Sequence, residues 1–358
     1  ELKNQNFNHL KIHTQYSICE GAIKIDDLKD FSKEQKFKSL ALCDTSNLCG
    51  SLEFSEKISK VGTQPIIGTQ INFKYGETTG LLPLYAMNKD GYKRIIELSS
   101  LSYLSNDIIS EPNVKFDELL QKNEGVAIFS GTINGFFGKL FNKGRFDEIQ
   151  SLFLQLKSKY KDNFYIEIQR HNDANEIGFE RFNLTKSLEL EIPIIATNEV
   201  FYISKEMHEA HDALICIKNK TYINEKKRIR YSNQHYLKND SEMTKLFADL
   251  PEALENNYNF PLRCNFKPSF SKPILPNISS EKGGNADEIL KKESLDGLKE
   301  KFRIFFKLDD EAILTNKDYL RYKDRLDHEI DIIVEMKYAS YFLIVSDYIK
   351  WAKKNDIP

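Results

Sequence analysis

Polar residues stand at the ends of several short apolar segments in the first 200 residues. Each segment has the pattern of a β-strand, and most are followed by a helical pattern. The strand ends of a closed β/α barrel gather at one rim, where ligand-binding and catalytic groups are expected. The residues at these ends therefore decide which chemistry the chain can perform, and they are His13, Asp44, Gln70, Thr132, His171 and Glu199.

The strands that would position these residues are largely apolar and mostly alternate with helices. Segments 39–44 and 193–197 are almost entirely apolar, as parallel strands buried on both faces are. Counting 65–73 and 81–87 separately gives seven strands, and 74–80 has the glycines of a hairpin connection. This order predicts an α/β parallel sheet or barrel rather than a sandwich. The predicted helices are 26–37, 51–60, 90–102, 145–160, 174–190 and 206–217.

The sequence changes character near residue 267. Segment 267–288 is rich in proline, glycine and serine and has no periodicity, so it is the predicted linker between domains. The linker separates a barrel domain, 5–266, from a mainly helical region, 289–358. The helices predicted after the boundary are 286–306, 316–337 and 340–354.

Composition restricts the class of protein. The 358 residues include 51 Lys+Arg and 53 Asp+Glu, a net charge of −2, so charge makes no general case for nucleic-acid binding. Five cysteines without C-x-x-C spacing indicate reduced thiols and argue against structural zinc. The sequence has neither a membrane-length apolar run nor a signal peptide, which predicts a cytoplasmic protein. The missing initiator Met and the abrupt end at Pro358 suggest a fragment of a longer chain.

A series of ordered motifs resembles one protein family. They include FNHLKIHTQYSICEG, ALCDTSNLCGSLEF, QPIIGTQ, FYIEIQRH, IIATNEVFYI, LFADLPEALENN and EMKYASYFLIVSDYIKWAKKNDIP. Together they resemble the N-terminal half of the alpha subunit of bacterial replicative DNA polymerase III, over essentially the whole chain. The resemblance implies that the first domain is a polymerase-and-histidinol-phosphatase (PHP) domain, a distorted seven-stranded β/α barrel. It also implies that 289–358 is the start of the polymerase palm.

In PHP domains with phosphoesterase activity, His and carboxylate groups at the strand ends hold a cluster of metal ions. This chain departs from that pattern, because the matching positions include Lys11, Thr45, Gln70, Leu81, Thr132 and Phe201. The resemblance leaves His13, Asp44, His171 and Glu199 as a vestigial metal-binding set, with Glu20 as a further candidate. The Lys11 ammonium could occupy the space and charge of a lost cation, which favours a structural rim. The alternative is a residual site for one divalent ion.

Other residues that could bind ligands carry weaker patterns. His9 is expected to be packed or capped, and His235 carries no signal. His208 and His211 are one helical turn apart, and we expect them on a solvated helix face. The aromatic residues of 340–351 are expected to pack in the palm core, and a base-stacking platform is the alternative.

The resemblance implies a polymerase subunit whose catalytic carboxylates lie beyond Pro358. The parent protein would add deoxynucleotides to a primer on a template with Mg²⁺, whereas this part would be a scaffold without catalytic residues. Its implied partners are a proofreading exonuclease subunit, other replisome subunits and primer-template DNA, with no membrane. The alternatives are a metal-dependent PHP phosphoesterase or 3′–5′ exonuclease, and a protein-binding module.

Overall fold

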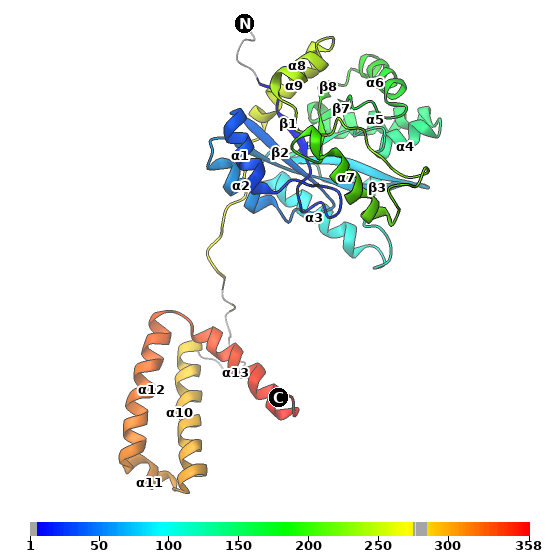
Figure 1. Ribbon diagram of the computed structural model, residues 1–358. Helices are drawn as coiled ribbons and strands as arrows, with labels where there is room; N and C mark the ends of the chain where they lie inside the picture. Colours follow the sequence, from blue (N-terminus) through cyan, green and yellow to red (C-terminus); the bar gives the residue numbers. More distant parts are fainter. Residues whose placement is uncertain (1–5, 275, 277–284) are drawn as a thin grey trace. The chain divides into compact units, whose positions relative to one another are not determined.

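The computed structural model describes residues 6–274, 276 and 285–358. The chain divides into two compact units, Glu1–Phe270 and Ser271–Pro358 (Figure 1). Residues 275 and 277–284 of the predicted linker lie outside the described residues. The predicted limits of that linker therefore remain a prediction.

One curled, mixed sheet forms the centre of the first unit (Figure 1). Among the described residues its strands are β1 (His9–Ile12), β2 (Ser39–Thr45), β3 (Gln64–Tyr75), β4 (Thr78–Ala86), β5 (Val114–Lys115), β6 (Val126–Phe129), β7 (Phe164–Ile168), β8 (Ile194–Ala196) and β9 (Glu199–Val200). Their order across the sheet is β8-β7-β6-β4-β3-β2-β1-β9, with β5 beside β3. Seven of them are the predicted strands, and the other two, β5 and β9, have two residues each.

The sheet returns to itself because its two end strands belong to one chain segment. β8 pairs with β7 and β9 pairs with β1, yet only Thr197 and Asn198 separate β8 from β9. The Thr197 N–H still donates to the Ile168 carbonyl at 3.1 Å, and the His13 N–H donates to the Val200 carbonyl at 2.9 Å. β8, the last predicted strand, therefore continues through a kink into β9, and this one segment reaches both edges of the sheet. The prediction of a distorted β/α barrel is confirmed, with nine strands among the described residues where seven were predicted.

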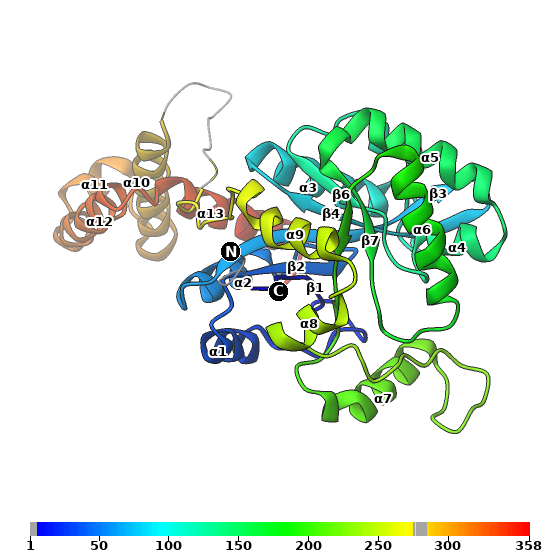
Figure 2. The same cartoon turned by 90° about the horizontal axis from the view of Figure 1, so that it is seen from above.

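Helices connect the parallel strands and surround the sheet (Figure 2). They are α1 (Ile25–Gln35), α2 (Ser51–Ser59), α3 (Lys89–Leu104), α4 (Phe136–Asn142), α5 (Phe146–Tyr160), α6 (Glu176–Leu190), α7 (His208–Asn219), α8 (Asp240–Leu246) and α9 (Pro251–Asn259). Short 3₁₀ turns are η1 (Phe116–Leu120), η2 (Lys161–Asn163), η3 (Lys205–Met207) and η4 (Phe260–Arg263). The predicted hairpin has no helix: β3 and β4 run antiparallel there, and Tyr75 pairs with Thr78. On its other side β4 is also antiparallel to β6.

One end of the barrel interior is filled by apolar side chains. Tyr85 of β4, Phe129 of β6 and Tyr165 of β7 belong to one buried cluster there, to which β1, β2, β3 and β8 also contribute. Gly68 of β3 makes room for this cluster, because a Cβ at that position would lie 2.6 Å from Tyr85 Cδ1. Side chains alternate along a strand, so polar residues at even spacing from this cluster turn into the same interior.

The second unit is helical throughout its described residues. Its helices are α10 (Ala286–Phe306), α11 (Asp310–Thr315), α12 (Lys317–Glu335) and α13 (Ala339–Lys354). Two small apolar clusters hold them, one around Leu290 and Leu343 and one around Phe302 and Tyr319. The aromatic side chains predicted to pack in the palm core are 43% to 60% exposed in this chain: Tyr341, Phe342, Tyr348 and Trp351. No described helix has both the length and the apolar character needed to cross a membrane.

Candidate functional site at the barrel rim

An irregularity in the first strand turns two successive residues toward the barrel interior. His9 of β1 lies opposite Leu40 of β2, but Ile12, three residues later, lies opposite Leu42, only two residues later. A bulge of this kind re-aims side chains, and bulges recur next to active sites. Leu10 consequently joins the inner apolar cluster, and its neighbour Lys11 also reaches inner residues.

Lys11, His13, Glu167 and Glu199 form a buried polar network that we call the lysine cluster. Lys11 Nζ lies 3.2 Å from Glu167 Oε1 and 3.9 Å from Glu199 Oε1. His13 Nε2 is 3.0 Å from the same Glu199 oxygen. The first three side chains are at most 1% exposed, and Glu199 is 12% exposed. The ammonium therefore sits inside the barrel between two carboxylates.

The charges of the lysine cluster depend on one another. Burial disfavours the Lys11 ammonium, but Glu167 and then Glu199 outweigh burial, and the pKa of Lys11 is raised. Burial also disfavours the Glu199 carboxylate, yet Lys11 and the hydrogen bond from His13 hold its pKa below the usual range. For Glu167, burial is the larger effect and raises the pKa, although Lys11 opposes it. The chain itself thus supplies the cation that these carboxylates face.

A small pocket at the rim collects most of the positions where the sequence departs from the PHP ligand pattern. Its volume is about 80 Å³, and its lining includes Lys11, Gln70, Leu81, Thr132, Glu199 and Phe201. Beside it, the Thr45 hydroxyl donates to Glu20 Oε1 at 2.6 Å and accepts from Gln70 Nε2 at 2.8 Å. Phe201 stacks on His13 with ring centroids 4.8 Å apart. Thr45 and Gln70 therefore bond to each other, and Thr45 and Phe201 also contact the retained residues Glu20 and His13.

Two candidate carboxylates have other protein partners. Asp44 accepts hydrogen bonds from the Thr14 N–H at 2.6 Å and from the Thr14 and Ser17 hydroxyls at 2.7 Å each. Burial nevertheless raises the pKa of Asp44. Glu20 accepts from Lys218 Nζ at 2.6 Å. Asp44 therefore anchors the turn that follows β1.

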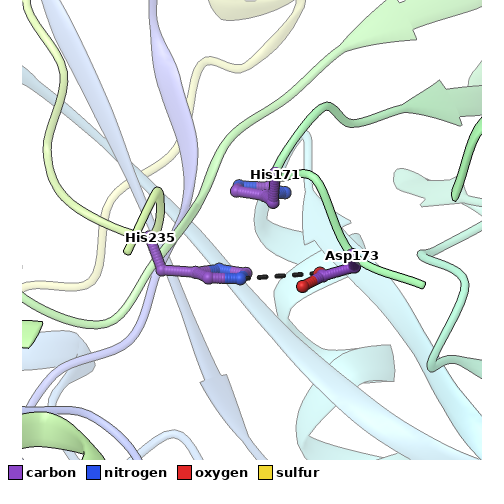
Figure 3. A group of neighbouring side chains, drawn as sticks. All are labelled: His171, Asp173 and His235. Atoms are coloured by element: carbon purple, nitrogen blue, oxygen red, sulfur yellow. Dashed lines mark ion pairs between the residues drawn. The ribbon is translucent and has the colours of Figure 1, made fainter. Parts of the chain in front are cut away.

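His171, Asp173 and His235 form a second polar group, which we call the histidine cluster (Figure 3). Within the described residues, they are the one set of three or more His, Cys, Asp or Glu side chains whose ligand atoms all lie within 4.8 Å of one another. The two rings stack with centroids 4.1 Å apart and planes 2° apart. Asp173 Oδ2 lies 3.6 Å from His235 Nε2. Burial, then His235 and Lys238, hold the pKa of His171 well below its ordinary value, so this ring is neutral.

The four predicted ligands are thus divided among three places. His13 and Glu199 are hydrogen-bonded to each other, and Asp44 holds a turn. His171 approaches Glu199 through the backbone, with the Glu199 N–H 3.2 Å from His171 Nε2. Metal binding by all four residues stays a prediction.

Sequence reasoning overlooked Glu167, Asp173 and His235. A signal for Glu167 exists in FYIEIQRH, where polar residues recur with the strand period of two at 167, 169 and 171. Asp173 lies in the loop after that strand, where no periodic pattern indicates which way a side chain points. His235 comes from the segment between α7 and α8, far along the chain, and no local periodicity connects it with His171.

The prediction of a solvated face for His208 and His211 is wrong. His211 is 2% exposed, and its Nε2 lies 2.7 Å from the Glu20 carbonyl oxygen. His208 Nε2 lies 3.0 Å from the Tyr231 carbonyl oxygen. The reason is that α7 packs His211 against the turn after β1 and His208 against the segment that follows α7. His9, predicted to be packed, is fully buried.

Two family descriptions match separate parts of the chain. Residues 9–171 match the PHP domain, and residues 288–358 match the bacterial DNA polymerase III alpha NTPase domain. Among solved structures, a putative metal-dependent phosphoesterase from Bifidobacterium adolescentis covers 54% of this chain and 86% of its own at 14% identity. Its TM-score of 0.31 is too low to bear on activity.

Curated relatives align with the chain from end to end. The DNA polymerase III subunit alpha of Caulobacter vibrioides is 35% identical over 100% of this chain and 31% of its own length. That of Rickettsia conorii is 36% identical over 98% of this chain and 30% of its own. That of Vibrio cholerae is 32% identical over 100% of this chain and 31% of its own. The chain therefore spans less than a third of the length of these relatives.

Proposed function

We propose that this chain, whose residues 9–171 are a PHP domain, forms the N-terminal part of the alpha subunit of a bacterial DNA polymerase III. The alignment with such subunits over the whole chain and the match of residues 288–358 support this assignment. The complete subunit would carry out template-directed DNA synthesis, with Mg²⁺ held by palm carboxylates outside these 358 residues. Residues 1–358 would contribute no catalytic carboxylate to that reaction.

Within that subunit, the barrel acts as a scaffold. The observation that carries this role is the buried Lys11 ammonium, 3.2 Å from Glu167 and 3.9 Å from Glu199. A metal-dependent phosphoesterase uses clustered cations to generate hydroxide and to neutralise a phosphodiester. A permanent ammonium within ion-pair distance of the carboxylates opposes a second cation there, because like charges repel at short range.

The scaffold role predicts where the protein acts and which partners it binds. The chain would act in the cytoplasm with the other replisome subunits. The PHP barrel would hold a separate proofreading exonuclease subunit, and primer-template DNA would be bound through the complete polymerase.

The experiment compares the 358-residue chain with its His13→Ala variant. Both are stripped of metal, supplied with Zn²⁺ or Mn²⁺, and assayed on a phosphodiester and on 3′-labelled single-stranded DNA. The scaffold role predicts no hydrolysis above that of His13→Ala. Hydrolysis that disappears in His13→Ala would favour the alternative, a PHP phosphoesterase or 3′–5′ exonuclease with a divalent ion at His13, Asp44, His171 and Glu199.

A second assay tests the polymerase assignment. Where the gene continues past Pro358, its complete product should extend a primed template with Mg²⁺. A complete product that does not extend the primer would contradict the assignment to a polymerase subunit.

A further inference from the structure

His235 presents an unpartnered nitrogen to a carboxylate. Its Nδ1 lies 3.0 Å from the Glu199 carbonyl oxygen, which can only accept, so Nδ1 carries the proton. In the neutral ring, Nε2 then has a free lone pair, and this atom is buried without a hydrogen-bond partner among the described residues. Asp173 Oδ2 lies 3.6 Å from it. A ring N–H on a backbone carbonyl, with the opposite nitrogen free, is the usual arrangement of a metal-binding histidine.

His171 repeats this arrangement across the ring stack. Its Nε2 lies 2.9 Å from Asn198 Oδ1, an atom that must accept because Asn198 Nδ2 donates to the Tyr236 carbonyl at 2.9 Å. The contact of the Glu199 N–H with the same Nε2 is longer, at 3.2 Å. Nε2 therefore donates, and Nδ1 is left as a buried lone pair for which the described part of the chain offers no hydrogen-bond partner. The nearest carboxylate oxygen, Oε1 of Glu176, lies 3.8 Å from it.

We propose that the histidine cluster binds one divalent transition metal ion through His171 Nδ1, His235 Nε2 and the Asp173 carboxylate. Two imidazoles and a carboxylate suit Zn²⁺ and neighbouring transition metals better than Mg²⁺ or Ca²⁺, which prefer oxygen ligands. The ion would satisfy two buried lone pairs and a carboxylate, whose ligand atoms lie within 4.8 Å of one another.

Binding requires that the stacked rings move. The ring planes are 2° apart, so their in-plane lone pairs cannot meet at one ion in this arrangement. Zinc bonds of about 2.0–2.2 Å place ligand atoms about 3.4 Å apart, closer than the 4.8 Å limit of this cluster. Rotation of an imidazole about its Cβ–Cγ bond is soft, and the Asp173 side chain is 15% exposed, which admits the ion. Metal binding therefore breaks the His171–His235 stack.

This site differs from the vestigial rim set. It uses neither His13 nor Asp44, and the Glu199 carboxylate stays with His13 and Lys11. Glu199 acts instead through its backbone carbonyl, which orients the His235 ring. The two sites share His171 alone, so variants at the other positions distinguish them.

The test is a calorimetric zinc titration of the metal-stripped 358-residue chain, with zinc-edge X-ray absorption to count imidazole ligands. We expect one equivalent of zinc with two imidazole nitrogens. Asp173→Asn and His235→Gln should each weaken zinc affinity about tenfold or more, because even outer-sphere partners of metal ligands are worth about 10–100-fold. Asp173→Asn is the safer variant for folding, because its side chain is partly exposed and nearly isosteric.

Two histidine variants serve as controls. His13→Gln removes a histidine of the lysine cluster, and His328→Gln removes an exposed histidine of α12. Each should leave zinc affinity unchanged, with folding checked by circular dichroism. Absence of zinc binding, an unaffected Asp173→Asn variant, or loss of binding in either control would overturn the proposal. Loss in His13→Gln would place the ion at the rim set instead.

Discussion

The lysine cluster and the histidine cluster meet at Glu199, yet their charges are balanced in different ways. The Glu199 carboxylate bonds to His13 and faces Lys11, while its backbone carbonyl accepts from His235. In the lysine cluster, an ammonium of the chain faces the carboxylates. In the histidine cluster, two ring nitrogens have no hydrogen-bond partner within the described ranges, and Asp173 faces one of them. The chain therefore supplies a cation, Lys11, to the carboxylates of the lysine cluster, and it supplies no comparable ammonium to Asp173 within the described histidine cluster.

This difference has energetic consequences. Removing one member of a buried ion pair leaves an uncompensated charge, whereas a neutral ring with an unpartnered lone pair loses only a hydrogen bond. The lysine cluster should therefore matter for folding and the histidine cluster for binding.

Lys11→Met should have the largest effect, because it leaves Glu167 and Glu199 without their buried cation. We expect the free energy of unfolding to fall by about 3–5 kcal/mol, measured by urea denaturation. Lys93→Met is the matched control, since Lys93 and its partner Asp90 are both 67% exposed, and it should change stability by less than about 1 kcal/mol. Equal effects of the two variants would mean that the lysine cluster is not a structural ion pair.

Lowering the pH should remove the stabilising contribution of the buried histidines before that of Lys11 and Glu199. A histidine with a lowered folded pKa binds fewer protons than the unfolded chain below pH 6.5, so stability is lost as pH falls from 6.5. Burial lowers the pKa of His9 to about 4, which corresponds to a loss of about 3 kcal/mol by pH 4, from 2.5 pH units at about 1.4 kcal/mol each. The lowered pKa of His171 acts with the same sign.

Two members of the lysine cluster, Lys11 and Glu199, keep their charges in this window, whereas the raised pKa of Glu167 brings its protonation closer to it. The raised pKa of Lys11 preserves its contribution below 10.5, and the lowered pKa of Glu199 delays its loss to stronger acid. Urea denaturation from pH 7 to pH 4 should therefore show a smaller acid loss in His9→Gln and His171→Gln than in the unmodified chain. If both variants lost as much unfolding free energy between pH 7 and pH 4 as the unmodified chain, His9 and His171 would not be the source of the acid sensitivity.

Asp44→Asn should have a moderate effect on stability and none on zinc affinity. The carboxylate accepts three hydrogen bonds from Thr14 and Ser17, and an amide can accept only at its one oxygen. We expect a loss of about 1–2 kcal/mol in the free energy of unfolding. Calorimetry with zinc on the same variant checks the second half of the prediction, and weaker zinc binding would assign Asp44 to a metal site.

Asp173→Asn should have the smallest effect on folding. Its carboxylate is partly exposed and 3.6 Å from His235, so the free energy of unfolding without metal should change by less than about 1 kcal/mol. A thermal melt with excess zinc should then separate the two proteins, because a ligand that binds only the folded state stabilises it. A large loss without metal would show that Asp173 is structural.

Periodicity alone located most of the secondary structure. The seven strands and the helices longer than ten residues were predicted from alternation and from the helical period. The helices that were missed, α4, α8, α9 and α11, have six to nine residues, so the helical period is weak in them, although α2, with nine residues, was predicted.

The sequence by itself determined which residue types stand at the strand ends, and that Lys11, Gln70 and Leu81 replace the expected ligands at the rim. The tertiary structure decided which of these residues meet. The bulge in β1 turns Lys11 inward onto Glu167. The kink at Thr197–Asn198 places the Glu199 carboxylate in the lysine cluster and its backbone carbonyl against His235 of the histidine cluster. The segment after α7 brings His235 onto His171. Such contacts depend on strand register and on the paths of loops between distant residues, and local sequence patterns carry no information about either.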